Sequence, residues 1–154
     1  MTDFLPEDLW RDYSETRLLF TASNKQYCLT ANKSGDNNWP WESDIKEIFI
    51  ISAIHPRSTQ STSAEIVELE EKMKVRLNTL DLTYIRCTGK PAHDDWPEEE
   101  SFMIFSATEK DIVSLCREFD QNAYFHWTKE FWAIKGVFTS QTTFTNWTLE
   151  EITQ

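Results

Sequence analysis

The chain has 154 residues, a length that suits one domain with a single hydrophobic core. It is 40% hydrophobic and 14% aromatic, with only 3 Gly and 5 Pro, which excludes a disordered or collagen-like chain. Acidic residues outnumber basic ones by 26 to 15, and the formal net charge of −11 disfavours generic binding to DNA, to RNA or to anionic lipid surfaces.

The N-terminal residues are acidic and lack the apolar segment of a signal peptide. The longest apolar run, residues 48–54, is far below the roughly 20 residues that a transmembrane helix needs. Cys28, Cys87 and Cys116 are odd in number and widely spaced, which is typical of buried reduced thiols. These features predict a cytoplasmic protein with no membrane partner.

The N-terminal part of the chain predicts a helix, a hairpin and a loop. Apolar side chains within residues 1–16 fall on one helical face, so we expect a short helix that docks on the rest of the protein. Two β-prone runs, 17–22 and 27–31, flank a polar turn and predict a hairpin. Residues 32–44 are rich in turn formers and predict a loop anchored by its two tryptophans.

The middle of the chain carries its clearest strand and its clearest helix. Residues 47–54 (EIFIISAI) are almost continuously apolar, which predicts a central strand buried on both faces. Pro56 ends this strand, because proline cannot donate to a β-ladder. Thr62 and Glu65 have the spacing of a capping box, and the residues that follow carry one apolar stripe from Ile66 to Leu80.

In the second half of the chain, predicted strands again alternate with a loop and a helix. The expected elements are a strand at 82–87, a polar loop at 88–100, a strand at 101–107, a helix capped by Thr108, strands at 122–127 and 131–138, and a polar tail from 139. The second helix is expected to bury the face formed by Ile112, Leu115, Cys116 and Phe119, which follow helical spacing.

From 47 to 127 the order is strand, helix, strand, strand, helix, strand. This order predicts an α+β fold, a split β-α-β (ferredoxin-like) sandwich with a mixed or antiparallel sheet and two main helices on one face. An N-terminal hairpin and a C-terminal strand are expected to extend the sheet. We expect a single domain over 1–154, with its core at about 45–127, the N-terminal helix and hairpin in 1–44, and a C-terminal strand and polar tail in 128–154.

Recognisable motifs for catalysis or cofactor binding are absent from the sequence. With 3 glycines, the chain contains neither a P-loop nor a dinucleotide-binding fingerprint, and it has no G-x-S-x-G elbow. The histidines lack partners at zinc-ligand spacing, and the acidic run at 94–100 lacks the alternation of a calcium loop. We therefore expect no metal and no cofactor, and an enzyme is the least favoured function.

One polar segment keeps a binding function open. His55-Pro56-Arg57-Ser58 follows the central strand and leads into the capped helix. Polar groups between a strand end and a helix N-terminus suit an anion or a polar ligand, and Arg57 adds a bidentate donor. The alternative interpretation is a tight turn followed by an N-cap.

Four short blocks occur in order along the chain: SAIHPRS (52–58), SAE (63–65), WPEEESF (96–102) and FDQNA (119–123). Together they resemble a small bacterial family without an assigned activity, domain of unknown function 3293, over roughly residues 45–127. His55 stands where that family usually has Asn, and Ile66 where it often has a second Asn. The resemblance supports the fold outline and implies no activity.

In the expected fold, the ends of separate strands converge on one rim, so their polar residues are expected to form a ligand-binding cluster. The candidates are His55, Arg57, Ser58, Glu100, Ser101, Gln121 and Asn122. The alternative is that Glu100 and Gln121 only satisfy buried backbone groups at strand starts.

Three functions follow from these features. The favoured one is a non-catalytic binding module for a small polar or anionic ligand. The alternative is a protein-interaction or regulatory protein that uses exposed Trp and an acidic surface, including an acidic nucleic-acid mimic or a phage- or defence-related inhibitor. An enzyme would be favoured only by a convergent pocket containing a perturbed His55 or Glu100.

Overall fold

The structure, a computed structural model, describes residues 5–32, 35, 38–55, 59–91 and 98–152. Its helices are α1 (Glu7–Glu15), α2 (Ser63–Thr79) and α3 (Glu109–Glu118). Its strands are β1 (Arg17–Ala22), β2 (Lys25–Asn32), β3 (Glu47–Ser52), β4 (Thr83–Lys90), β5 (Glu99–Phe105), β6 (Ala123–Thr128), β7 (Trp132–Gly136) and β8 (Thr142–Ile152). Within these ranges, no helix has the length and apolar character needed to cross a bilayer.

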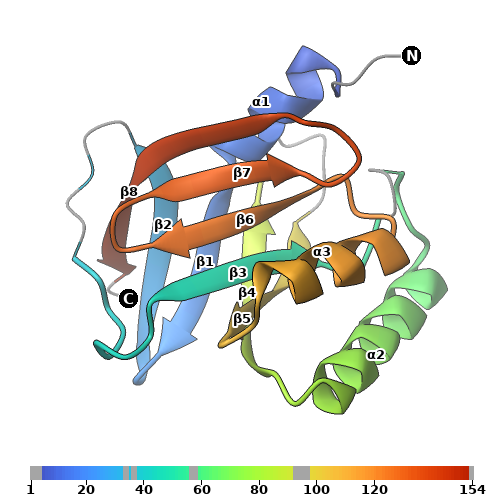
Figure 1. Cartoon of the computed structure of the whole chain (residues 1–154), viewed down its shortest axis with the longest axis horizontal. Helices are drawn as coiled ribbons and strands as arrows, with labels where there is room; N and C mark the ends of the chain where they lie inside the picture. The colour runs from blue at the N-terminus through green and yellow to red at the C-terminus, as the bar shows by residue number, and fades with distance from the viewer. Residues whose placement is uncertain (1–4, 33–34, 36–37, 56–58, 92–97, 153–154) are drawn as a thin grey trace.

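The strands form a closed antiparallel barrel in the order β1-β2-β8-β7-β6-β3-β5-β4, and the pairing of β4 with β1 closes it (Figure 1). The predicted ferredoxin-like sandwich is therefore wrong. The N-terminal hairpin and the C-terminal strands do not end as sheet edges, because β2 pairs with β8 along most of its length. Closure satisfies the backbone groups that free edges would leave unpaired.

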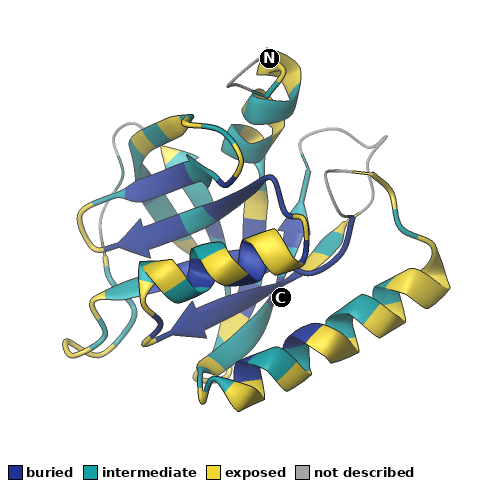
Figure 2. Ribbon diagram, turned by 45° about the vertical axis from the view of Figure 1, so that its right-hand side comes forward, coloured by how far each residue is buried: buried dark blue, intermediate teal, exposed yellow. Residues whose placement is uncertain are grey.

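Side chains alternate along each strand between the barrel interior and its outer surface. Leu18, Ile50 and Trp127 belong to the interior cluster. Phe49 and Ile104 face outward and form a second apolar layer with side chains of α2 and α3. The strand β3 is buried on both faces, as its continuous apolar sequence predicted, and Figure 2 shows α2 and α3 alternating between buried and exposed residues.

Both predicted helix starts are confirmed. Thr62 accepts a hydrogen bond from the Glu65 amide at 3.2 Å, and the Glu65 carboxylate accepts one from the Thr62 amide at 2.8 Å. Thr108 accepts a hydrogen bond from the Asp111 amide in the same way. These caps satisfy amides that have no partner inside the helix.

The turn between β1 and β2 is also local in origin. Ser23 and Asn24 both have positive φ, 51° and 66°, as a two-residue hairpin turn requires. The predicted hairpin is thus confirmed, with a shorter turn than the sequence indicated.

Two tryptophans from the loop before β3 fill one end of the barrel. The Trp39 ring lies 5.0 Å from the Trp127 ring, and the Trp41 ring lies 5.0 Å from the Phe105 ring, measured between centroids. Trp39 Nε1 donates to the Ile45 carbonyl at 3.0 Å. The expected anchoring of this loop by its tryptophans is confirmed.

The C-terminal segment differs from the polar tail that we expected after residue 139. It forms β8, which pairs with both β2 and β7. Trp147 is fully buried inside the barrel, and its Nε1 donates to the Thr128 carbonyl at 2.8 Å. The alternation of threonine with aromatic residues predicts a strand only weakly. The segment forms β8 because it pairs with β2 and β7.

We predict that Trp147→Ala lowers the free energy of unfolding by about 3–5 kcal/mol, because it removes a fully buried indole and leaves the Thr128 carbonyl without its donor. Phe144→Ala is the matched control on the same strand, since 59% of Phe144 is exposed. Urea unfolding followed by circular dichroism measures both. Equal losses for the two variants would contradict a closing role for β8.

Candidate functional site

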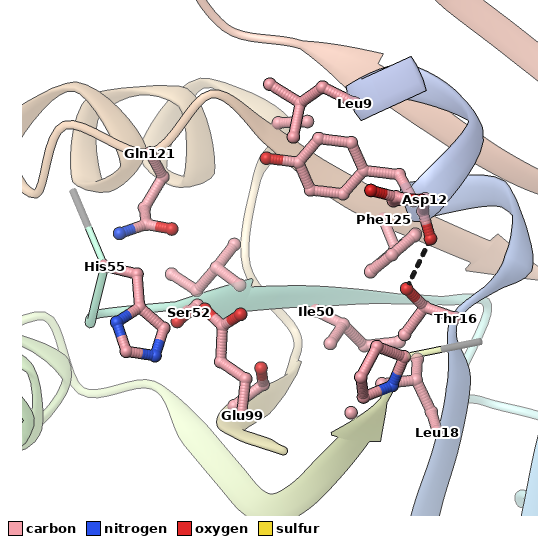
Figure 3. A pocket seen from close by; sticks show the side chains of 16 residues that line it. Leu9, Asp12, Thr16, Leu18, Ile50, Ser52, His55, Glu99, Gln121 and Phe125 are labelled. Carbon is pink, nitrogen blue, oxygen red and sulfur yellow. Dashed lines mark hydrogen bonds between the residues drawn. The ribbon is translucent and has the colours of Figure 1, made fainter. Parts of the chain in front are cut away.

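A cavity of about 250 Å³ opens at the end of the barrel opposite the tryptophans (Figure 3). We call it the mouth pocket. Side chains of α1, β1, β3, β5 and β6 line it, together with His55, Gly89, Pro91 and Gln121. Its apolar wall includes Leu9, Leu18, Ile50 and Phe125. Its polar wall includes Ser52, His55, Glu99, Ser101 and Gln121.

Four strands carry a small inward-facing residue near this end of the barrel, which leaves room for the pocket. Ser52, Gly89, Ser101 and Ala123 all line it, one each from β3, β4, β5 and β6. One layer deeper, the inward positions carry larger side chains such as Ile50 and fill the interior. Because side chains fill the centre of a barrel of this size, a layer of small residues leaves a cavity.

The helix α1 covers the mouth pocket while burying none of its own residues completely. The Tyr13 ring packs edge-on against Phe125, with centroids 6.3 Å apart. Trp10 Nε1 donates to Thr143 Oγ1 at 2.9 Å. At the end of the helix, Thr16 Oγ1 donates to the Asp12 carbonyl at 2.7 Å (Figure 3). The predicted docking of an N-terminal helix is confirmed.

Glu99 is the acidic group of the mouth pocket. It lies on β5 with the same inward parity as Ser101 and Met103. Burial raises the pKa of the Glu99 carboxyl to about 7, and a hydrogen bond with the Ser52 side chain opposes that rise in part. Removing a carboxylate from water disfavours its charged form, so Glu99 gains and loses a proton near neutral pH.

Glu100, the acid that we placed in the candidate cluster, lies outside the mouth pocket. It accepts a hydrogen bond from Thr88 Oγ1 at 2.7 Å, and its carboxylate lies 3.9 Å from Arg86 Nη2. Neighbouring residues of a strand point to opposite faces, so Glu100 and Ser101 cannot both face the pocket. Applied to β5, the same alternation would have found Glu99 from the sequence.

His55 lies three residues after the end of β3 and has an unusual backbone conformation. Its φ of 56° is uncommon for a residue with a side chain, and only 4% of the residue is exposed. Its amide donates to Ser61 Oγ, and its Nδ1 accepts from the Ser61 amide, both at 2.9 Å. The neutral ring therefore carries its proton on Nε2, and burial lowers its pKa.

Gln121 connects the pocket to the backbone around it. Its Nε2 donates to the Ile54 carbonyl at 2.9 Å and to the Phe119 carbonyl at 3.2 Å. This bond ties the segment after β3 to the segment before β6. The alternative interpretation of Gln121, satisfaction of buried backbone groups, thus describes part of what it does.

The other candidates have different positions. Asn122 is buried and does not line the mouth pocket, and its carbonyl accepts from the Val137 amide at 2.9 Å. Arg57 and Ser58 lie outside the described residues. The structure therefore brings His55, Ser101 and Gln121 together, and it adds Ser52 and Glu99, which the sequence analysis missed.

A second polar cluster lies on the outer surface of the barrel. His126 Nε2 lies 2.8 Å from Glu47, and His126 Nδ1 accepts from Lys135 Nζ at 3.0 Å. Lys135 and Tyr124 both donate to Glu109 of α3 at 2.6 Å. None of these residues lines the mouth pocket, and the hydrogen bonds hold α3 against β6 and β7.

The charges of the mouth pocket are negative. Its described lining includes Glu99 and Asp12 but no lysine or arginine. In the part of the chain that the structure describes, no cluster of three His, Cys, Asp or Glu residues could hold a metal ion. The polar groups of the lining can donate and accept hydrogen bonds, and Glu99 can exchange a proton.

We predict that Glu99 makes the protein less stable as pH rises. Its pKa is raised in the folded state, so the folded chain binds more protons than the unfolded chain between about pH 4.5 and 7. The free energy of unfolding falls through this range as pH increases. Between pH 5 and 8, the free energy of unfolding of the wild type should fall by about 1–3 kcal/mol relative to that of Glu99→Gln.

Urea unfolding at several pH values measures this difference. Glu100→Gln is the matched control, because Glu100 lies on the outer face of the same strand. Subtracting the Glu99→Gln curve removes the contributions of His55 and His126, whose lowered pKa values act in the opposite direction. If the free energy of unfolding depended on pH in the same way in the wild type and in Glu99→Gln, a buried titrating carboxyl would be contradicted.

A family model described as "Protein of unknown function (DUF3293)" matches residues 51–124. The matched segment includes the polar wall of the mouth pocket, from Ser52 to Gln121, whereas α1, β1, β2, β7 and β8 lie outside it. No curated protein and no solved structure matches the chain. Over residues 51–124, the resemblance of this chain to the DUF3293 family is confirmed.

Proposed function

We propose that this protein is a binding module whose mouth pocket holds a small molecule with an apolar body and a polar end. The observation that carries the proposal is the division of one cavity into an apolar wall and a wall of convergent hydrogen-bonding groups. Ligand sites in proteins commonly combine these features. Figure 3 shows Ser52, His55, Glu99 and Gln121 on one side, and Leu9, Leu18 and Phe125 on the other.

The size of the cavity supports a small ligand. At about 250 Å³, it lies below the roughly 300–1,000 Å³ that is typical of sites for drug-sized molecules. The deeper part of the barrel is filled, so the ligand reaches Ile50 and no further. A metabolite or fragment with one ring fits this space better than a nucleotide does.

Charge favours one of the two classes of ligand that the sequence left open. An anion would meet Glu99 and Asp12, and the described lining offers it no lysine or arginine. Like charges in a partly desolvated site repel each other strongly. These residues therefore support a neutral polar or cationic ligand over an anionic one.

The proximity of Glu99 and His55 favours a second candidate, an enzyme that moves a proton on its bound ligand. A carboxyl with a pKa of about 7 has a proton affinity suited to general acid–base chemistry. Turnover separates this candidate from the binding module. NMR spectra of bound compounds recorded over a day should show the compounds unchanged for a module and converted for an enzyme.

We predict that fragments found by ligand-observed NMR shift the backbone amides of Leu18, Ile50, Ser101 and Phe125, because these residues line the mouth pocket. Ala123→Leu should weaken the binding of those fragments at least tenfold, since the larger side chain occupies the cavity. Ala64→Leu, on the exposed part of α2, is the control and should bind as the wild type does.

Circular dichroism checks that both variants fold. Unchanged fragment affinity in a folded Ala123→Leu protein would contradict the proposal. A second blocking variant, Ser101→Leu, tests the same cavity from β5 if the first variant does not fold.

A further inference from the structure

We infer that the mouth pocket is selective for a small organic cation, an amine or amidine carried on an apolar body, which pairs with the Glu99 carboxylate. This inference rests on the proposed binding function and names the chemical class of the ligand. It is drawn from the placement of Glu99 in the barrel, from the charges around it, and from the apolar wall opposite.

The placement of Glu99 is the first step. Its carboxyl lies beside the Ser52 side chain (Figure 3), and Ser101 lies on the same face of β5. Figure 3 shows Glu99 beside Ser52 and His55, across the pocket from Leu18 and Phe125. A ligand whose body rests on the apolar wall thus points its other end toward the carboxyl group.

The second step is the absence of a counter-ion in the described part of the chain. There the basic side chains near β4 and β5 pair with other acids: Arg86 with Glu70 and Glu100, and Lys90 with Glu98. None of the ion pairs between described residues includes Glu99. A buried carboxylate without a cation is costly, whereas an ammonium or amidinium group that enters the pocket would offset that cost.

Among the described residues, the other titratable groups that face the pocket do not supply a positive charge near neutral pH. Asp12 and Tyr13 come from α1, and Asp12 adds negative charge at the exposed entrance. Burial lowers the pKa of His55, so its ring is neutral near pH 7. The field at the entrance therefore attracts cations and repels anions.

Three compounds of nearly equal size test the charge preference: benzylamine, benzyl alcohol and benzoate. Titrations of labelled protein followed by NMR give their dissociation constants at pH 7.5. Benzylamine should bind at least tenfold more tightly than either of the others. Equal or tighter binding of benzyl alcohol or benzoate at the mouth pocket would overturn the cation inference and leave the binding module standing.

The dependence on pH tests the role of Glu99. Benzylamine stays protonated between pH 6 and 8, while a carboxyl with a pKa of about 7 goes from mostly neutral to mostly charged. The affinity for benzylamine should therefore rise about tenfold over this range. In Glu99→Gln the rise should vanish and the affinity should fall to that of benzyl alcohol, whereas Glu100→Gln should behave as the wild type does.

Two outcomes of this experiment bear on different claims. A benzylamine affinity that is independent of pH, or unchanged in Glu99→Gln, overturns the inference. Arg57→Ala addresses a counter-ion from outside the described residues: unchanged benzylamine affinity supports the inference, and a tenfold gain overturns it. Failure of all three compounds and of the fragment collection to perturb the mouth pocket would instead contradict the proposed function itself.

Discussion

Closure of the sheet is the constraint from which the other features of this protein follow. The pairing of β1 with β4, and of β2 with β8, joins segments that lie far apart in the chain. A closed sheet has one interior and two ends, and every inward-facing residue belongs to a layer of that interior. The residues of each layer then decide whether it is packed or hollow.

The two ends of this barrel are built differently. At one end, Trp39 and Trp41 reach in from a loop and pack against Trp127 and Phe105. At the other end, four strands carry small inward-facing residues, and α1 lies across the opening with no fully buried residue of its own. Tight packing at one end supplies stability, and the loosely covered end retains the cavity of the mouth pocket.

The mouth pocket is distinguished by its acidic lining. The chain carries a net charge of −11, and the described lining of the pocket contains Glu99 and Asp12 but no lysine or arginine. Burial raises the pKa of the Glu99 carboxyl to about 7, which couples the charge of the site to the proton concentration near neutrality. Under the inference drawn above, the positive charge of the ligand would replace the proton of the neutral carboxyl.

The sequence by itself determined the local structure. Capping at Thr62 and Thr108, the apolar run of β3 and the hairpin around Ser23 depend on residues close together in the chain, so their patterns predict them. The sequence also contained the parity that separates Glu99 from Glu100, because alternation along a strand is a local property.

Only the tertiary structure decided that the sheet closes, that residues 142–152 form a strand, and that Glu99 shares a cavity with His55 and Gln121. Strand pairing over long separations depends on which edges find each other, and no local pattern encodes that choice. The same strand order is compatible with an open sheet until β4 meets β1. The sequence therefore did not predict the pocket, because its walls come from strands that only closure of the barrel brings together.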